Sequence, residues 1–166
     1  MSDLSTITGT IDFVTDAHWR QKDKQGQPYV LHVLRVGASL WRFPDDYIIA
    51  GMLHDIVEDT VYTLDDLSEL GASDAVVRAV EAVTKTESER TVEAYQKSVK
   101  KAVEDPIGLW VKAADMADNY KRLPGIQDEE LRQRLLLKYL TVKPIINSKI
   151  PRFDFGEIIP LDWPQL

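Results

Sequence analysis

Residues 50–60 read AGMLHDIVEDT, and the interpretation of the whole chain depends on this stretch. It continues an apolar helical pattern that begins at Asp45, expected to run to about residue 57, and it places His54 beside Asp55 near the helix end. Glu58 follows four residues after His54, a spacing that puts two side chains on one helical face. Imidazole and carboxylate groups are common metal ligands, but a buried histidine–aspartate pair is also a common structural hydrogen bond. The stretch alone leaves both interpretations open.

Helical periodicity dominates the chain, and no segment shows the sustained period-two alternation of a strand. Thr63 and Ser73 are suited to cap the helices that follow them. Pro28, Pro44 and Pro106 suit first-turn positions, where proline costs no hydrogen bond. The sequence therefore predicts an all-α fold of seven or eight helices.

A single domain is expected, because 166 residues suit one core and neither a linker nor a repeat divides the chain. Residues 1–148 would form the helical domain. Residues 149–166 contain three prolines and several large apolar side chains, and they would form a C-terminal tail packed on that domain.

The composition restricts the class of partner. The formal net charge of −7 argues against nucleic acid, which selects a basic face, but a metal and a few lysines can still attract a small phosphorylated ligand. No apolar run approaches the length of a membrane span, and the first ten residues lack a secretory pattern. Cysteine is absent, which excludes thiolate chemistry. We therefore expect a cytoplasmic protein, with homo-oligomerisation left open.

Two further polar clusters lie on apolar helical segments. His32 interrupts the aliphatic run YVLHVLRV, and alone it would be interpreted as a core histidine. In VKAADMADNYKRL, Asp115 and Asn119 are four residues apart on one face, with small alanines around them. Asp118, in the same segment, is expected to face solvent.

Taken together, the clusters predict a metal site. They supply two imidazoles and two carboxylates from three helices, and burying so many polar groups without a common partner would be costly. One divalent cation would satisfy them jointly. The residues concerned are His32, His54, Asp55 and Asp115.

The order His … His-Asp … Asp resembles the HD superfamily of metal-dependent phosphohydrolases. The likeness extends to four motifs of the hydrolase domain of the RelA/SpoT enzymes, between residues 17 and 123. The similar segments are AHWRQKDKQGQPYVLHVLRVG, AGMLHDIVEDT, AVTK and VKAADMADNYKRL. In length the chain looks like a stand-alone small alarmone hydrolase. The resemblance implies a single HD-type helical domain.

The resemblance also implies a role for each site residue. The metal ligands would be His32, His54, Asp55 and Asp115, and the ion would be Mn²⁺, although these donors suit Zn²⁺ and Fe²⁺ as well. The catalytic residues would be Glu58, Asp59 and Asn119. The substrate-binding residues would be His18, Lys24 and Lys121.

The implied reaction is hydrolysis of the 3′-pyrophosphate of ppGpp or pppGpp, which releases pyrophosphate and GDP or GTP. One departure concerns the basic loop, where Asp23 precedes Lys24 and the family commonly has an arginine that contacts the base. A carboxylate there would repel a polyphosphate and weaken recognition of guanine. An HD hydrolase acting on NADPH or a nucleoside phosphate is therefore an alternative. A non-catalytic HD domain that senses a nucleotide is a second one.

Overall fold

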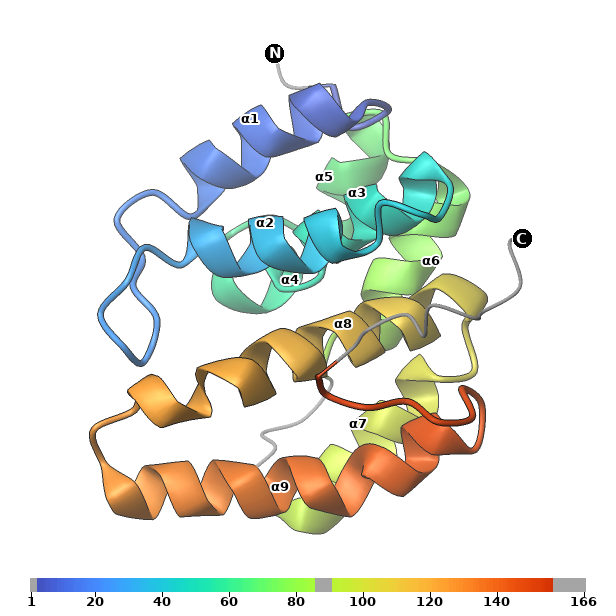
Figure 1. Ribbon diagram of the computed structural model, residues 1–166. Helices are drawn as coiled ribbons and strands as arrows, with labels where there is room; N and C mark the ends of the chain where they lie inside the picture. Colours follow the sequence, from blue (N-terminus) through green and yellow to red (C-terminus); the bar gives the residue numbers. More distant parts are fainter. Residues whose placement is uncertain (1–2, 86–90, 157–166) are drawn as a thin grey trace.

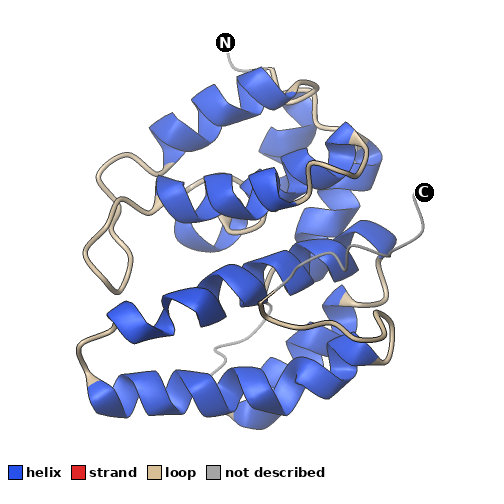
Figure 2. Ribbon diagram, viewed as in Figure 1, coloured by secondary structure: helices blue, strands red, loops and turns tan. Residues whose placement is uncertain are grey.

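The computed structural model describes residues 3–85 and 91–156, and the chain is helical in these ranges (Figure 1). The elements are α1 (Ile7–Ala17), α2 (Val30–Ser39), α3 (Asp45–Leu53), α4 (Ile56–Asp59), α5 (Leu64–Glu69), α6 (Asp74–Val83), α7 (Val92–Ala102), α8 (Pro106–Arg122), the 3-10 helix η1 (Leu123–Gly125) and α9 (Glu129–Asn147). The described residues form no named strand (Figure 2). The predicted all-α class is confirmed, with α4 as a single turn among longer helices.

Local sequence signals set several helix starts. Thr63 and Ser73 cap α5 and α6, since each side chain accepts a hydrogen bond from the backbone of the first turn. Pro106 is the first residue of α8, as expected. Pro28 is not in the first turn of α2, because it forms an antiparallel bridge with Lys22 that closes the preceding loop.

Helix α8 lies at the centre of the arrangement. It contacts α2, α3, α6, α7 and α9. In Figure 1, α1 and α2 lie above α8, while α9 runs below it in the opposite direction. All side chains of α8 from Trp110 to Asp118 are buried, so polar groups on any face of this stretch are enclosed by protein.

Helices α2 and α3 cross in close contact at two glycines. A Cβ atom on Gly51 would lie 2.9 Å from the Cα of Gly37 and 3.2 Å from Leu40 Cδ1. A Cβ atom on Gly37 would lie 2.9 Å from the carbonyl oxygen of Ile48. The two backbones can approach this closely only because neither residue has a side chain. The contact brings the start of α2 and the end of α3 together.

Residues 149–156 continue from α9 and add to the core. Ile150, Phe153 and Phe155 are buried, and the ring of Phe155 stacks on Tyr120 of α8 with centroids 4.3 Å apart. The remainder of the expected tail, residues 157–166, lies outside the described residues. Within the described ranges, no helix combines the length and the apolar character needed to cross a bilayer.

Replacement of Gly51 by alanine should destabilise the protein. Alanine normally favours a helix by about 0.5–1 kcal/mol over glycine, but here the added methyl group meets backbone that cannot rotate away. We expect a net loss of about 1–3 kcal/mol in the free energy of unfolding, measured by urea denaturation. Gly156→Ala is the control, since nothing lies within 4 Å of a Cβ at that position. A Gly51→Ala variant as stable as the wild type would contradict the close crossing.

Candidate metal centre

The helix that carries His54 ends earlier than the sequence predicted. Helix α3 ends at Leu53, Asp55 adopts φ −101° and ψ 1°, and a separate turn, α4, begins at Ile56. The expectation of one continuous helix to about residue 57 was therefore wrong. The local reason is the backbone of Asp55, whose dihedral angles lie outside the helical region and turn the chain. At the same point, His54 Nδ1 donates to the carbonyl oxygen of Gly51 at 2.8 Å, which holds the imidazole against the last turn of α3.

The polar groups of the three clusters lie together next to the break between α3 and α4. One ligand atom each from His32, His54 and Asp115 lies within 4.8 Å of the others, and all three residues are buried. His32 Nε2 is 3.4 Å from Asp115 Oδ1, and His54 Nε2 is 3.7 Å from the same oxygen. Asp55 Oδ2 lies 2.8 Å from His54 Nε2 and 3.6 Å from His32 Nε2. The structure thus brings together the four residues predicted as metal ligands.

The imidazole orientations fit a metal ion. His32 Nδ1 is 2.7 Å from Asp118 Oδ2, and His54 Nδ1 bonds to the carbonyl of Gly51, so in both rings Nδ1 is the donor. The Nε2 atoms, with their lone pairs, are left facing the carboxylates. His54 Nε2 is buried and makes no hydrogen bond within the described part of the chain. Metal-ligating histidines commonly hold their second nitrogen in this way.

The electrostatics of the cluster favour a cation. Burial lowers the pKa of His32, but hydrogen bonds to Asp115 and Asp118 outweigh it and raise the pKa to about 9. Burial raises the pKa of Asp115, yet the neighbouring Lys112 ammonium and the imidazoles hold that pKa well below its usual range. The carboxylates therefore attract positive charge, which a proton on imidazole or a divalent ion could supply. His32, His54, Asp55 and Asp115 could hold one divalent metal ion.

Asp118 is not exposed to solvent, and that expectation was wrong. The residue is only 9% exposed, and besides His32 Nδ1 it binds Arg35, whose Nε lies 2.6 Å from Asp118 Oδ1. Burial raises the pKa of Asp118, but the hydrogen bonds from His32 and Arg35 lower it to about 2. The missed signal is spacing: Asp118 follows Asp115 by three residues, and Arg35 follows His32 by three, so each pair shares a helical face.

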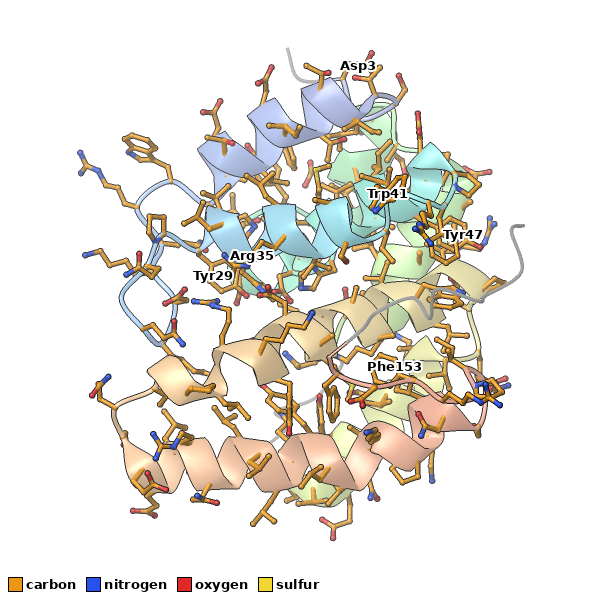
Figure 3. All side chains as sticks on the ribbon, in the orientation of Figure 1. Asp3, Tyr29, Arg35, Trp41, Tyr47 and Phe153 are labelled. Atoms are coloured by element: carbon orange, nitrogen blue, oxygen red, sulfur yellow. The ribbon has the colours of Figure 1, made fainter. Side chains whose placement is uncertain are left out.

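A cavity of about 360 Å³ opens beside the cluster. Figure 3 shows the labelled Tyr29 and Arg35 extending toward the space between α2 and α8. Tyr29 lines this cavity and donates a hydrogen bond of 2.5 Å from its hydroxyl to Asp55 Oδ2. Six lysine and arginine side chains also line it: Lys22, Lys24, Lys85, Lys112, Arg122 and Lys138. An acidic protein thus has a cavity with a locally basic wall.

Three residues predicted as catalytic line the same cavity: Glu58, Asp59 and Asn119. Asn119 Nδ2 donates to Asp115 Oδ1 at 2.5 Å. Glu58 accepts hydrogen bonds from the backbone N–H of Lys85 at 2.8 Å and from its Nζ at 2.7 Å. The acidic pair therefore lies within reach of a ligand in the cavity, and Glu58 has a fixed orientation.

The residues predicted to bind substrate are placed differently from one another. Lys24 lines the cavity, where lost hydration and the charge of Lys85 lower its pKa. Lys121 is exposed and is not among the lining residues. His18 is buried, at 2% exposure, and is also absent from the lining. The structure brings only Lys24 of these three to the cavity wall.

Asp23 makes internal contacts in the basic loop. Its carboxylate forms an ion pair with Arg122 at the end of α8, and accepts the backbone N–H groups of Gln25 at 2.7 Å and Gln27 at 3.0 Å. Burial raises the pKa of Asp23, but these partners, Arg122 first, lower it below its usual value. The negative charge is thus balanced locally. No local sequence pattern indicates Arg122 as the partner, because it is 99 positions away along the chain.

Comparisons with known proteins agree with this geometry. A family model described as "HD domain" matches residues 10–136. The guanosine-3′,5′-bis(diphosphate) 3′-pyrophosphohydrolase of Aquifex aeolicus is 35% identical over 134 residues, which is 76% of this chain and 19% of the relative. The bifunctional (p)ppGpp synthase/hydrolase SpoT of Escherichia coli K12 is 30% identical over 127 residues, 71% of this chain and 18% of the relative. This chain therefore spans less than a fifth of these relatives.

A solved structure supports the fold. It is described as "A metazoan ortholog of SpoT hydrolyzes ppGpp and plays a role in starvation responses". The TM-score is 0.75 at 23% sequence identity, and the match covers 91% of this chain and 88% of the other. At this identity, the likeness shows a shared fold.

Removal of the Asp118 carboxylate should weaken metal binding. Asp118→Ala leaves His32 Nδ1 without its acceptor, so the ring loses both its orientation and part of its basicity. We expect the affinity for Mn²⁺ to fall about 10–100-fold, measured by isothermal titration calorimetry. Asp118→Asn, which keeps an acceptor oxygen, should lose less of the affinity for Mn²⁺ than Asp118→Ala. Asp12→Ala, on the exposed face of α1, is the control. Equal affinity in Asp118→Ala and wild type would refute this role.

Proposed function

We propose, from the premise that this chain belongs to the HD domain family, that it is a metal-dependent hydrolase of the 3′-pyrophosphate of ppGpp or pppGpp. The observation that carries the proposal is the convergence of His32, His54, Asp55 and Asp115 beside a cavity with a basic wall. The acidic groups suit a divalent ion, and the lysines suit a polyphosphate. The names of the two curated relatives indicate the same substrate class.

The proposed cofactor is Mn²⁺, held by His32, His54, Asp55 and Asp115. Mixed nitrogen and oxygen donors also suit Zn²⁺ and Fe²⁺, so the choice of Mn²⁺ comes from the family resemblance. When bound, such an ion lowers the pKa of a water molecule and polarises a phosphoryl oxygen. Tyr29 would orient Asp55 through its hydroxyl, and Asn119 would orient Asp115 through its amide.

The carboxylates of Glu58 and Asp59 would accept the proton of the attacking water. In the reaction, a water oxygen bonds to the phosphorus attached to the 3′ oxygen, and the bond between that phosphorus and the 3′ oxygen breaks. Glu58 or Asp59 accepts the proton of the attacking water, and the 3′ oxygen takes up a proton from that carboxylic acid or from solvent and leaves as the 3′ hydroxyl of GDP or GTP. Pyrophosphate is the second product. Lys85 keeps Glu58 in place during this transfer.

The basic wall would bind the phosphates. Lys24 and Lys112 line the cavity on the side of the metal ligands, and Lys112 Nζ lies 3.1 Å from Asp115 Oδ2. These ammonium groups offset the negative charge of the substrate, which the protein as a whole would repel. Lys121 has no such place in the structure, and we do not propose it as a phosphate ligand.

A second candidate is the same chemistry on another phosphorylated nucleotide, such as NADPH or a nucleoside phosphate. The observation that favours it is the Asp23–Arg122 ion pair, which occupies the loop position where the family commonly has an arginine. The placement of Glu58 and Asp59 at the cavity argues against a non-catalytic sensor. A cytoplasmic location and a domain boundary at residue 148 stay predictions, and homo-oligomerisation stays open.

A nucleotide panel tests the proposal. The protein loaded with Mn²⁺ is incubated with ppGpp, pppGpp, NADPH and nucleoside phosphates, and the products are separated by ion-exchange chromatography. We expect GDP and pyrophosphate from ppGpp, and no reaction after treatment with a strong chelator. Hydrolysis of another nucleotide alone would select the second candidate. Failure to hydrolyse any of them, or activity that survives the chelator, would overturn both.

Two substitutions should separate metal binding from proton transfer. Asp55→Asn replaces a charged ligand by a weaker neutral one, so we expect metal and activity to be lost together. Glu58→Gln should retain the metal and lower kcat about 10²–10⁴-fold, because the amide cannot accept a proton. Metal content by elemental analysis and kcat by product release give the two readouts. Full activity of Glu58→Gln would show that Glu58 has no part in the proton transfer.

A further inference from the structure

The buried His18 and the half-buried Gln21 form a hydrogen-bonded connection to the acidic pair from outside the cavity. His18 Nδ1 lies 2.8 Å from Gln21 Oε1, and Gln21 Nε2 donates to the backbone carbonyl oxygen of Asp59 at 2.7 Å. His18 is the C-cap residue, directly after the last residue of α1. Its ring also lies beside that of Tyr29, with centroids 5.2 Å apart. The connection therefore joins α1, the basic loop and α4.

The chemistry of the groups fixes the orientation of each one. A carbonyl oxygen only accepts, so the amide nitrogen of Gln21 must face Asp59 and its oxygen must face His18. That oxygen also accepts, so His18 Nδ1 must carry a proton. If the amide were rotated by 180°, two acceptors would meet at Asp59. A His18 ring protonated at Nδ1 thus supports the one orientation of the Gln21 amide that lets its nitrogen donate to Asp59.

Helix α4 needs such outside support. It has only four residues, and a single helical turn is not stable alone because its last carbonyls have no partner within the helix. Gln21 supplies a partner for the carbonyl of Asp59, while Lys85 holds the side chain of Glu58 on the other side. The backbone N–H of Asp59 bonds to the carbonyl oxygen of Asp55 at 2.9 Å, which ties the turn to the metal site.

We propose that His18 and Gln21 are positioning residues, which hold the α4 turn so that Asp59 and Glu58 face the reacting water. The inference rests on the proposed hydrolase function and extends it to two residues that do not line the cavity. It also replaces the sequence-based prediction that His18 binds substrate. Its direct consequence is that kcat depends on the connection, whereas metal affinity and KM do not.

Gln21→Met tests the connection, since methionine has a similar length and shape but no hydrogen-bonding amide. We expect kcat to fall at least about tenfold, because a misplacement of catalytic groups by about 1 Å can lower the rate about 10²-fold. KM and the Mn²⁺ affinity should stay within about twofold of the wild type, the pattern of an interaction used in the transition state. Equal losses in metal affinity and kcat would overturn the proposal.

Two substitutions of His18 form a matched pair. Asn has a side-chain N–H at the position of Nδ1, so His18→Asn should retain the orientation of Gln21 and recover kcat to within about threefold. His18→Leu has a side chain of similar volume and no hydrogen-bond donor, and its kcat should be as low as that of Gln21→Met. Trp19→Ala, at a neighbouring side chain that is 68% exposed, controls for disturbance of the loop and should leave kcat unchanged. Equal kcat values for His18→Asn and His18→Leu would refute the role of His18.

Nuclear magnetic resonance gives a readout that does not need activity. In the wild type, we expect a His18 ring protonated at Nδ1, and Gln21 side-chain amide protons protected from exchange. The carbonyl ¹³C shift of Asp59 should move in Gln21→Met and His18→Leu but stay in place in His18→Asn. If the wild type hydrolyses no nucleotide, the proposed function fails, and these shifts still decide whether the connection holds α4. Unchanged Asp59 shifts in all variants would overturn it.

Discussion

The close crossing of α2 and α3 at Gly37 and Gly51 is the contact on which the site depends. It brings the imidazole of His32, near the start of α2, to that of His54, just past α3, with ring centroids 5.2 Å apart. Interiors are close-packed, so a side chain at the crossing could be accommodated only by moving a helix. Such a movement would separate the two imidazoles, whatever groups surrounded them.

The site depends, secondly, on the balance of charge around the crossing of α2 and α3. Asp55, Asp115 and Asp118 converge on the two histidines, and isolated buried carboxylates would be costly. Lys112 and Arg35 offset part of this charge from the same helices, at 3.1 Å from Asp115 and 2.6 Å from Asp118. A remaining negative balance is what allows the cluster to bind a cation. The basic residues farther along the cavity then favour an anionic ligand beside it, so an overall charge of −7 does not prevent binding of a nucleotide.

The fold class and the convergence of the four polar residues were predictable because they depend on local patterns and on the family resemblance. The predicted all-α class and the resemblance to HD hydrolases are confirmed, and His32, His54, Asp55 and Asp115 do converge. The errors arise where a residue's partner lies far along the chain or where the backbone leaves helical geometry. Helical periodicity suggests that Asp118 lies on a face of its helix that points to solvent. Its part of α8 is instead buried on every face. Likewise, no local pattern indicates that Asp23 pairs with Arg122, or that the backbone of Asp55 leaves helical geometry directly after His54.

The break at His54 and Asp55 also separates two groups of polar side chains within AGMLHDIVEDT. In a continuous helix, Glu58 would lie directly above His54 and both would compete for the same space beside the metal ligands. The break instead lets His54 and Asp55 face the cluster while α4 begins in a new direction, with Glu58 and Asp59 at the cavity wall. The separate turn has little stability of its own, so its position must be determined by contacts from other elements. Those contacts come from Gln21 of the loop and Lys85 after α6, which means that distant segments fix the geometry of the acidic pair.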